Sequence, residues 1–314
     1  MTTRDARKPP KAGEQHVTTP TAALAAIGLE AEFSVVVDGQ SVKPEHVFGS
    51  PRHIVRGPMM HRTGRSYHMP TGGAVYFDTG VIEIATPVIE IDKGCAARAG
   101  RSLWESIRFL RTELDAWEAR TGRTIHLSGF STHYNVSFEL PEAERGTGRT
   151  VEKFALLLTH ILAMPVMLLA ANRRSTGVGV RPRGNRIEIT ADFTPDAALM
   201  IATATLIVGI AREVMTWPSF ELGVLDGHSF PLVEPFTPEP HSSRKGWVAR
   251  FSSYAENPFM ADVNAVMWPT RRGETLSLRA IAARVTRYFW SSIRRLGDER
   301  SLRLIRAVMN GRAP

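Results

Sequence analysis

Cysteine is nearly absent from this sequence, with Cys95 the single example among 314 residues. One cysteine excludes an internal disulfide and any cysteine-rich metal site, and it fits a reducing, cytoplasmic setting best. The first 17 residues are polar and lack the apolar stretch of a secretory signal. We therefore expect a cytoplasmic protein in which residues 1–22 form a disordered leader.

Lysine is scarce as well, because only six of the 39 cationic residues are lysines. The formal charge of +8 is local: from Thr270 to the C-terminus, eleven arginines stand against three acids, which accounts for the whole excess. We predict that residues 241–314 form a basic helical C-terminal extension whose apolar stripe docks on the domain. An acidic protein partner for this extension is an alternative. Clustered arginine also fits nucleic acid, but no recognised nucleic-acid motif accompanies it, so nucleic acid is not the expected partner.

Uninterrupted apolar runs of membrane-spanning length are missing. The longest run, Phe154–Ala171, has 18 residues and is interrupted by Thr159, His160 and Pro165, whereas a span needs about 20 residues. A second run, Ala197–Ala211, is shorter, and several charged residues lie between the two. Helices that are apolar all round also occur in the cores of large soluble domains. We expect two buried helices and no membrane.

No phosphate-loop glycine motif and no internal repeat is present, and strands alternate with helices. Residues 41–69 are expected to be an irregular loop over the site. We predict an α+β fold over residues 23–240, with one mainly antiparallel sheet and helices packed on one face. The expected strands are 26–37, 74–78, 81–91, 124–140 with a bend at Gly129, and a pair within 177–191; the expected helices are 97–121, 150–172, 194–215, 276–296 and 299–310.

Ligand-type side chains gather on the strand faces that the core does not need. In the segment 131–137, Tyr134 and Val136 can supply the core, which leaves His133, Asn135 and Ser137 on the other face. The same alternation occurs in two further strands. In one it places two carboxylates on the same face, and in the other an arginine and a carboxylate. These residues are Glu30 and Glu32 in the first strand, and Arg186 and Glu188 in another.

A turn at Thr79-Gly80 adds two more acids, because Asp78 closes one strand and Glu83 lies in the next. Such a turn can aim both carboxylates into one cavity. Hard divalent cations prefer oxygen ligands, and Mg²⁺ commonly reaches proteins through carboxylates and substrate phosphates. Each feature also has a simpler interpretation: Asp78 can cap its turn, and Glu30 and His133 can be ordinary strand residues.

Four motifs in this order resemble the carboxylate–amine ligases of the glutamine synthetase fold. The similarity is greatest to glutamate–cysteine ligase and looser to the ligase and deamidase that act on the prokaryotic ubiquitin-like protein Pup. It covers roughly residues 26–215, and the spacing between the two acids of the second motif is shorter than in those relatives. The motifs are Gly28-Leu29-Glu30-Ala31-Glu32, Asp78 with Glu83-Ile84-Ala85-Thr86-Pro87, His133-Tyr134-Asn135-Val136-Ser137, and Arg186-Ile187-Glu188-Ile189 with Asp192.

The resemblance implies a glutamine synthetase-like, curved sheet and an ATP-dependent ligase with Mg²⁺ or Mn²⁺. A carboxylate would take the γ-phosphate of ATP, and an amine would then displace phosphate from the acyl phosphate. Asp78 would be a catalytic base or a metal ligand, and Arg186 would act on the reacting phosphate. The implied metal ligands are Glu30, Glu32, Glu83, His133 and Glu188, and the implied nucleotide contacts are Asn135, Arg181 and Arg183.

Other functions stay open at this point. The substrate is expected to be a small amino acid or a protein carboxylate. A non-catalytic relative could use the same fold as a binding or scaffold module, with the basic extension as its contact surface. An amide hydrolase on the same frame is the third alternative.

Overall fold

The computed structural model describes residues 25–140, 148–241 and 246–313, so the expected leader lies outside the described residues. Within these ranges the chain is a mixed α+β fold built on one large antiparallel sheet. β2 (Gln40–Val42) and β7 (Ile89–Glu90) pair with β1 beside its longer neighbours. The order across the sheet is β11 (Glu239–Pro240), β12 (Trp247–Ala249), β9 (Val178–Pro182), β10 (Arg186–Asp192), β8 (Ile125–Ser137), β1 (Ala26–Val37), β6 (Val81–Ala85), β5 (Ala74–Asp78), β4 (Ser66–His68) and β3 (Met60–Thr63).

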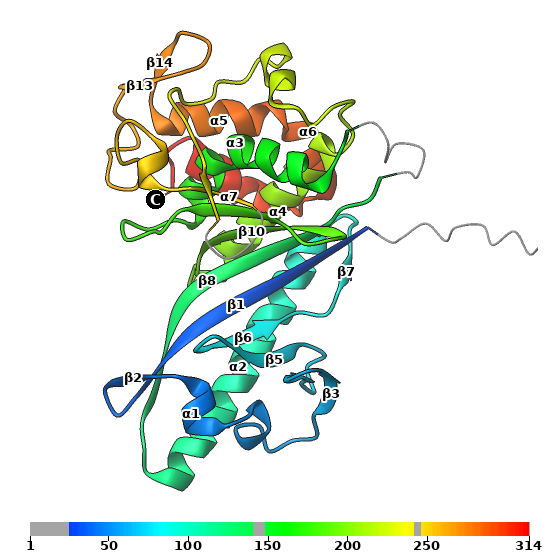
Figure 1. Ribbon diagram of the computed structural model, residues 1–314, viewed down its shortest axis with the longest axis vertical. Coiled ribbons are helices and arrows are strands. Elements are labelled where there is room, and N and C mark those ends of the chain that lie inside the picture. Colours follow the sequence, from blue (N-terminus) through cyan, green and yellow to red (C-terminus); the bar gives the residue numbers. More distant parts are fainter. Residues whose placement is uncertain (1–24, 141–147, 242–245, 314) are drawn as a thin grey trace, which may run out of the picture.

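The long helices pack against the sheet and against one another. α2 (Cys95–Thr121) contacts β1 and β6, α3 (Val151–Ala170) contacts β9 and β10, and α4 (Ala197–Val214) contacts β8. β1 and β8 run diagonally through the middle of the molecule, and α3 and α4 gather with the C-terminal helices at one end, while α2 extends toward the other (Figure 1). The predicted α+β class is therefore confirmed.

Strict alternation along β1 explains how one strand serves two environments. Ile27, Leu29 and Ala31 are buried under the helices, whereas Glu30 and Glu32 between them are only partly buried on the opposite face. Because successive side chains in a strand point to opposite faces, the apolar set builds the core and leaves the acids outside it.

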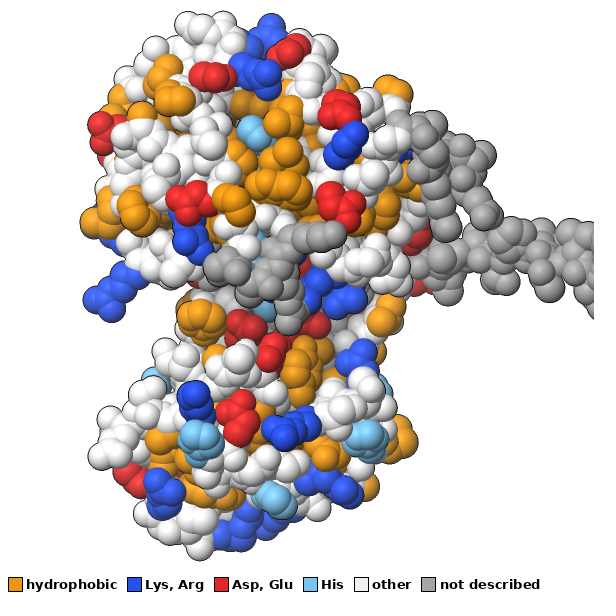
Figure 2. Space-filling view, in the orientation of Figure 1, with side chains coloured by type: hydrophobic (Ala, Val, Ile, Leu, Met, Phe, Trp, Pro, Cys, Tyr) orange, Lys and Arg blue, Asp and Glu red, His pale blue; other side chains and the backbone are white. Residues whose placement is uncertain are grey.

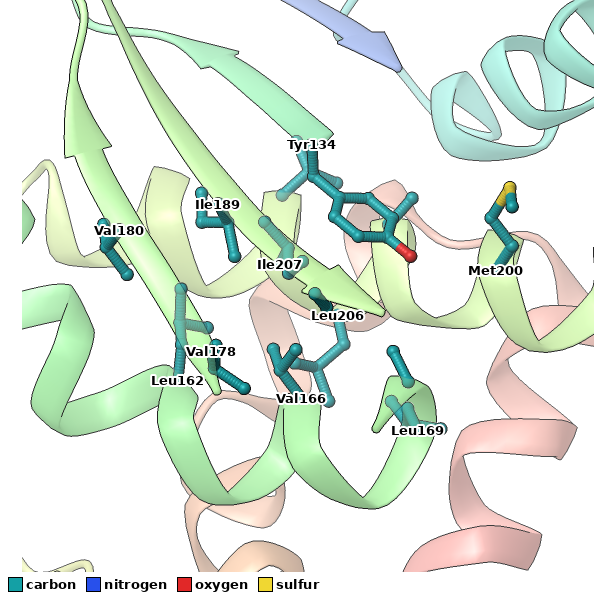
Figure 3. Packing of buried hydrophobic residues seen from close by; sticks show 14 of the residues in the cluster. Tyr134, Leu162, Val166, Leu169, Val178, Val180, Ile189, Met200, Leu206 and Ile207 are labelled. Carbon is teal, nitrogen blue, oxygen red and sulfur yellow. The ribbon is translucent and has the colours of Figure 1, made fainter. Parts of the chain in front are cut away.

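The core lies between the sheet and the helices. Tyr134 of β8 and Ile189 of β10 face Leu162 and Val166 of α3 and Leu206 of α4 (Figure 3). The apolar runs expected to be buried form α3 and α4, and 78% and 67% of their most apolar windows are inside the protein. Length and composition alone would let both helices cross a membrane. Their burial confirms the prediction of core helices.

A β-bulge interrupts the pairing of β1 with β8. Glu32 pairs with Ser131 and Phe33 pairs with Gly129, so Phe130 is the extra residue. A Cβ on Gly129 would lie 2.1 Å from the ring of Phe193, which packs edge-on against Phe33. Only glycine fits beside that ring, and the bend expected at residue 129 is this bulge.

Several element boundaries differ from those expected. Residues 41–69 are not one irregular loop, because they form α1 (Pro44–Phe48), a 3₁₀ turn and the β3–β4 hairpin. The strand expected over 81–91 is broken into β6 and β7 around Pro87, which has no amide hydrogen to donate. α4 is capped by the carboxylate of Asp196, which accepts from the backbone of Ala198 and Leu199, so the helix begins three residues later than the expected 194.

The C-terminal segment is part of the same folded body. The expected boundary after residue 240 falls between β11 and β12, which pair in the main sheet. The helix expected over 276–296 is divided at the buried Phe289 into α5 (Leu278–Tyr288) and α6 (Trp290–Leu296), and α7 (Glu299–Met309) follows. α5 packs on α3, and α6 and α7 pack on α4. Residues 246–313 therefore pack against the helices that cover the sheet. A small second sheet of β13 (Trp268–Pro269) and β14 (Thr275–Leu276) lies in this segment.

Candidate functional site

Antiparallel register aligns the candidate residues in rows across the sheet. Glu30 on β1 lies opposite His133 on β8. The next row along the strands is longer and runs through Tyr76, Glu83, Glu32, Ser131 and Asp192. In the row on the other side of His133, Asn135, Glu188 and Arg181 follow one another across β8, β10 and β9. The face that carries no apolar core is therefore a continuous polar surface.

Three of the five predicted metal ligands converge. One ligand atom each from Glu30, Glu83 and His133 can be chosen so that all three lie within 4.8 Å of one another. His133 Nδ1 lies 3.4 Å from Glu30 Oε2 and 3.8 Å from Glu83 Oε1. This nitrogen is buried without a hydrogen-bond partner among the described residues. The cluster could hold a divalent metal ion.

The pKa shifts in this cluster reflect its burial and its crowded negative charge. Burial and then the charge of Glu30 raise the pKa of Glu83 to about 8. Burial would also raise the pKa of Glu30, but the close approach and charge of His133 outweigh it and hold that pKa below its ordinary value. Burial opposes a charged His133, yet Glu30 and the neighbouring carboxylates raise its pKa. A cation is therefore favoured at this position.

Glu32 lies on the edge of the cluster and is held by a serine. The hydroxyl of Ser131 donates to Glu32 Oε2, and Glu32 Oε1 is 3.7 Å from His133 Nε2. Ser131 Oγ is also 3.3 Å from His133 Nε2. Glu32 is thus close enough to share a cation-binding role with the three-residue cluster.

Glu188 lies in a different environment from the other predicted metal ligands. Its carboxylate is fully buried, accepts from Arg181 at Oε1, and accepts from Arg183 Nε at Oε2 over 2.7 Å. Arg181 and Arg183 were predicted to contact nucleotide, and here one carboxylate orients both. In this geometry Glu188 holds guanidinium groups, and its predicted metal role stays a prediction.

Arg186 is connected to the metal cluster through Asn135. Arg186 Nε donates to Asn135 Oδ1 over 2.8 Å, and Asn135 Nδ2 donates to Glu30 Oε2 over 3.1 Å. Arg186 and Arg183 bind these partners through Nε, and within the described part of the chain no hydrogen bond is assigned to their terminal nitrogens, which can therefore bind an anion. Asn135 therefore holds Arg186, on the basic side of the site, at a fixed position relative to Glu30 on the acidic side.

A cavity of about 560 Å³ collects these residues. It is lined by Glu30, Glu32, Glu83, His133, Arg181, Arg183 and Arg186, together with Asp78 at its exposed edge. Asp78 accepts from the hydroxyl of Thr79 over 3.0 Å, so its turn-capping and catalytic interpretations are compatible. Acidic side chains gather at the narrow middle of the molecule, with basic side chains directly above them (Figure 2).

Sequence reasoning missed several residues that line this cavity. Tyr76 lies across from Glu83 in the sheet, and burial and the surrounding carboxylates raise the Tyr76 pKa. His241 lies beside the arginines, where burial and then the charge of Arg181 lower its pKa. Tyr76 could have been found from the sequence, because it lies two residues before Asp78 in the same strand and therefore on the same face. The sequence around His241 carries no such pattern.

The chain matches no protein-family model, and no curated protein matches it in sequence. Among solved structures it is similar to the crystal structure of the complex between the prokaryotic ubiquitin-like protein Pup and its ligase PafA, with a TM-score of 0.45 and 10% identity. The alignment covers 92% of this chain and 64% of that chain, so this protein spans less than two thirds of the solved one.

Proposed function

We propose that this protein is an ATP-dependent ligase that joins a carboxylate to an amine, on a glutamine synthetase-like sheet. The observation that carries the proposal is a single cavity that contains a three-residue cation site at one part and three oriented arginines at another. A cation beside an anion-binding surface suits a nucleotide triphosphate, whose charge both can neutralise. Each of the four sequence motifs that resemble carboxylate–amine ligases supplies residues to this cavity, and Arg181 and Arg183 come from outside them.

The donor set fits a divalent cation. Glu30 and Glu83 offer carboxylate oxygens, and His133 offers a buried nitrogen that has no hydrogen-bond partner among the described residues. Carboxylates suit Mg²⁺ and Mn²⁺, and an added imidazole suits Mn²⁺ better than Mg²⁺. When bound, the ion would neutralise phosphate charge. Glu32 is the next available carboxylate, 3.7 Å from the imidazole.

The arginines would bind and orient the anionic part of the substrates. Glu188 fixes Arg181 and Arg183, and Asn135 fixes Arg186, so little side-chain freedom is left to lose when an anion binds. Oriented guanidinium groups stabilise charge that develops on a transferring phosphoryl group.

The reaction would proceed in two displacements. The substrate carboxylate attacks the γ-phosphorus of ATP, ADP leaves, and an acyl phosphate forms. The amine then attacks the acyl carbon, phosphate leaves, and the amide is complete. Asp78, at the exposed edge of the cavity, would accept the proton that the amine loses.

Nucleotide binding is the decisive test. Calorimetry with Mn²⁺ and a non-hydrolysable ATP analogue should show saturable binding to the wild-type chain, and Glu83→Gln should weaken it. Glu105→Gln, an exposed acid on α2, is the matched control. Absence of binding at millimolar nucleotide would refute the ligase and favour the scaffold. Amide cleavage without ADP formation would favour the hydrolase.

A further inference from the structure

The bulge in β8 turns an aromatic ring toward the cavity. In a regular strand, Phe130 would face away from Ser131, on the side of the apolar core. Because two residues of β8 oppose one residue of β1 at the bulge, Phe130 and Ser131 both line the cavity. Re-aiming a side chain is a common consequence of bulges beside functional sites.

The ring of Phe130 is exposed, although the fold has an apolar core directly behind it. Its relative exposure is 57%, whereas Phe33 and Tyr134 on the neighbouring positions of the sheet are at 4% and 0%. Gly129 leaves no room for a side chain on the core side, where Phe193 packs. The sequence therefore places an aromatic residue at the cavity wall and glycine beside the ring of Phe193.

The surroundings of Phe130 are negative. Glu32 and Asp192 belong to the row of Ser131, the residue next to Phe130. Asp78 ends β5, three strands away from β8, and lines the same cavity as the other two acids. Asp192 is held by Asn172 and Ser175, which fixes its carboxylate at this end. An aromatic face next to carboxylates attracts a cation, since the ring quadrupole and the charges act in the same direction.

The cationic residues of the cavity are at its other end. Arg186 and Asp192 are the first and last residues of β10, which places them about 20 Å apart at roughly 3.3 Å per residue. Arg181 and Arg183 are on the Arg186 side, through their shared contact with Glu188. The cavity is thus polarised, and an anion and a cation have separate ends to occupy.

We propose that Phe130 is a specificity-determining residue that binds the protonated primary amine of the acceptor substrate against its ring. The role as acceptor rests on the proposed ligase function, whereas the binding of an alkylammonium group does not. Phe130 and its neighbouring carboxylates select a cationic amine over a neutral or anionic nucleophile of the same size.

The test measures binding of n-butylammonium to the full chain by NMR titration, without metal or nucleotide. n-Butanol is the neutral probe of similar shape. Phe130→Leu should weaken n-butylammonium binding by about two- to fivefold and leave n-butanol unchanged, because the loss is a cation–π contact. Phe130→Trp should retain the affinity. Phe251→Leu, at a 60% exposed phenylalanine that does not line this cavity, should change neither probe.

Three outcomes would overturn the proposal: no saturable binding of n-butylammonium to the wild-type chain, equal binding to wild type and Phe130→Leu, or an equal loss for n-butanol. If Phe130→Leu weakened only the binding of the ATP analogue, the ring would belong to the site of the nucleotide base, and the proposal would also be overturned. Failure of the ligase function is distinguishable, because it would abolish nucleotide binding and leave the ammonium titration intact.

Discussion

His133 and Glu30 lie opposite each other on β8 and β1, with Nδ1 of the imidazole 3.4 Å from Oε2 of the carboxylate. The pair forms the centre of the acidic half of the cavity, and Glu83 completes it from β6. The three side chains come from adjacent strands of one sheet, so the pairing of β8, β1 and β6 brings them together.

Removing one ligand of the cluster should weaken metal binding and leave the fold intact. Glu83→Gln keeps the size of the side chain but loses its charge, and we expect the Mn²⁺ dissociation constant to rise by at least tenfold, an order of magnitude typical for the loss of a ligand-shell group. Electron paramagnetic resonance of free Mn²⁺ measures this constant. Unchanged affinity in Glu83→Gln, with Glu105→Gln as the control, would exclude Glu83 as a ligand.

Mn²⁺ affinity should increase with pH. The pKa of Glu83 is raised to about 8, so at pH 6 the carboxyl is protonated and the ion must displace a proton. Affinity should therefore rise by about tenfold per pH unit up to pH 8 for one displaced proton. His133, whose pKa is also raised, acts in the same direction. Calorimetric titrations between pH 6 and 8 check the slope, and a flat profile would contradict it.

Glu188 should be needed for stability as well as for anion binding. Glu188→Ala would leave Arg181 and Arg183 without their buried partner, which we expect to cost about 3–5 kcal/mol in the free energy of unfolding. Glu221→Ala breaks the exposed pair with Lys153 and should cost no more than about 1 kcal/mol. Urea denaturation of both variants compares them. Equal losses in the free energy of unfolding for the two variants would show that the burial of Glu188 does not add to the stability.

The docking of the C-terminal helices should depend on a glycine. A Cβ on Gly209 of α4 would lie 2.6 Å from the Cα of Ile293 in α6, so Gly209→Ala forces two backbones apart. We expect a loss of about 1–3 kcal/mol, typical of overpacking. Gly223→Ala is the control, because an added Cβ there meets nothing within 4 Å. Thermal melts that show no difference between these variants would contradict the contact.

His160 should make the protein less stable in mild acid. Burial, and then the charge of Arg271, lower its pKa to about 4, while the unfolded chain has the ordinary value near 6.5. Between these values the unfolded state binds the extra proton, so this contribution to stability is complete above pH 6.5 and is lost as the pH falls toward 4, by up to about 3 kcal/mol. His160→Gln should flatten the pH dependence of urea unfolding in that window, and an unchanged slope would refute the role.

The long elements and the cluster could be predicted because their signals are local. Period-two alternation places Glu30 and Glu32 on one face of β1, and hydrophobic periodicity marks α2. The sequence predicted one mainly antiparallel sheet, and the convergence of Glu30 with Glu83 and His133 follows from the order β8-β1-β6 within it.

Other features depend on tertiary contacts that no local pattern reveals. Glu188 faces Arg181 across β9 and β10, so a carboxylate that looked like a metal ligand pairs with arginines. Phe130 lines the cavity because of the bulge in the pairing of β8 with β1, beside which Phe193, distant in sequence, leaves room only for glycine at position 129. The short β3–β4 hairpin is too brief and too polar to show a period.

The antiphase arrangement of β1 has a consequence for how this protein can change. Buried apolar residues and partly buried acids alternate along β1. A one-residue slip caused by an insertion near Leu29 would therefore turn the apolar side chains toward the cavity and the acids toward the core. A change in the length of this strand would therefore disturb both the core and the cavity, unless a bulge like the one at Phe130 absorbed the extra residue.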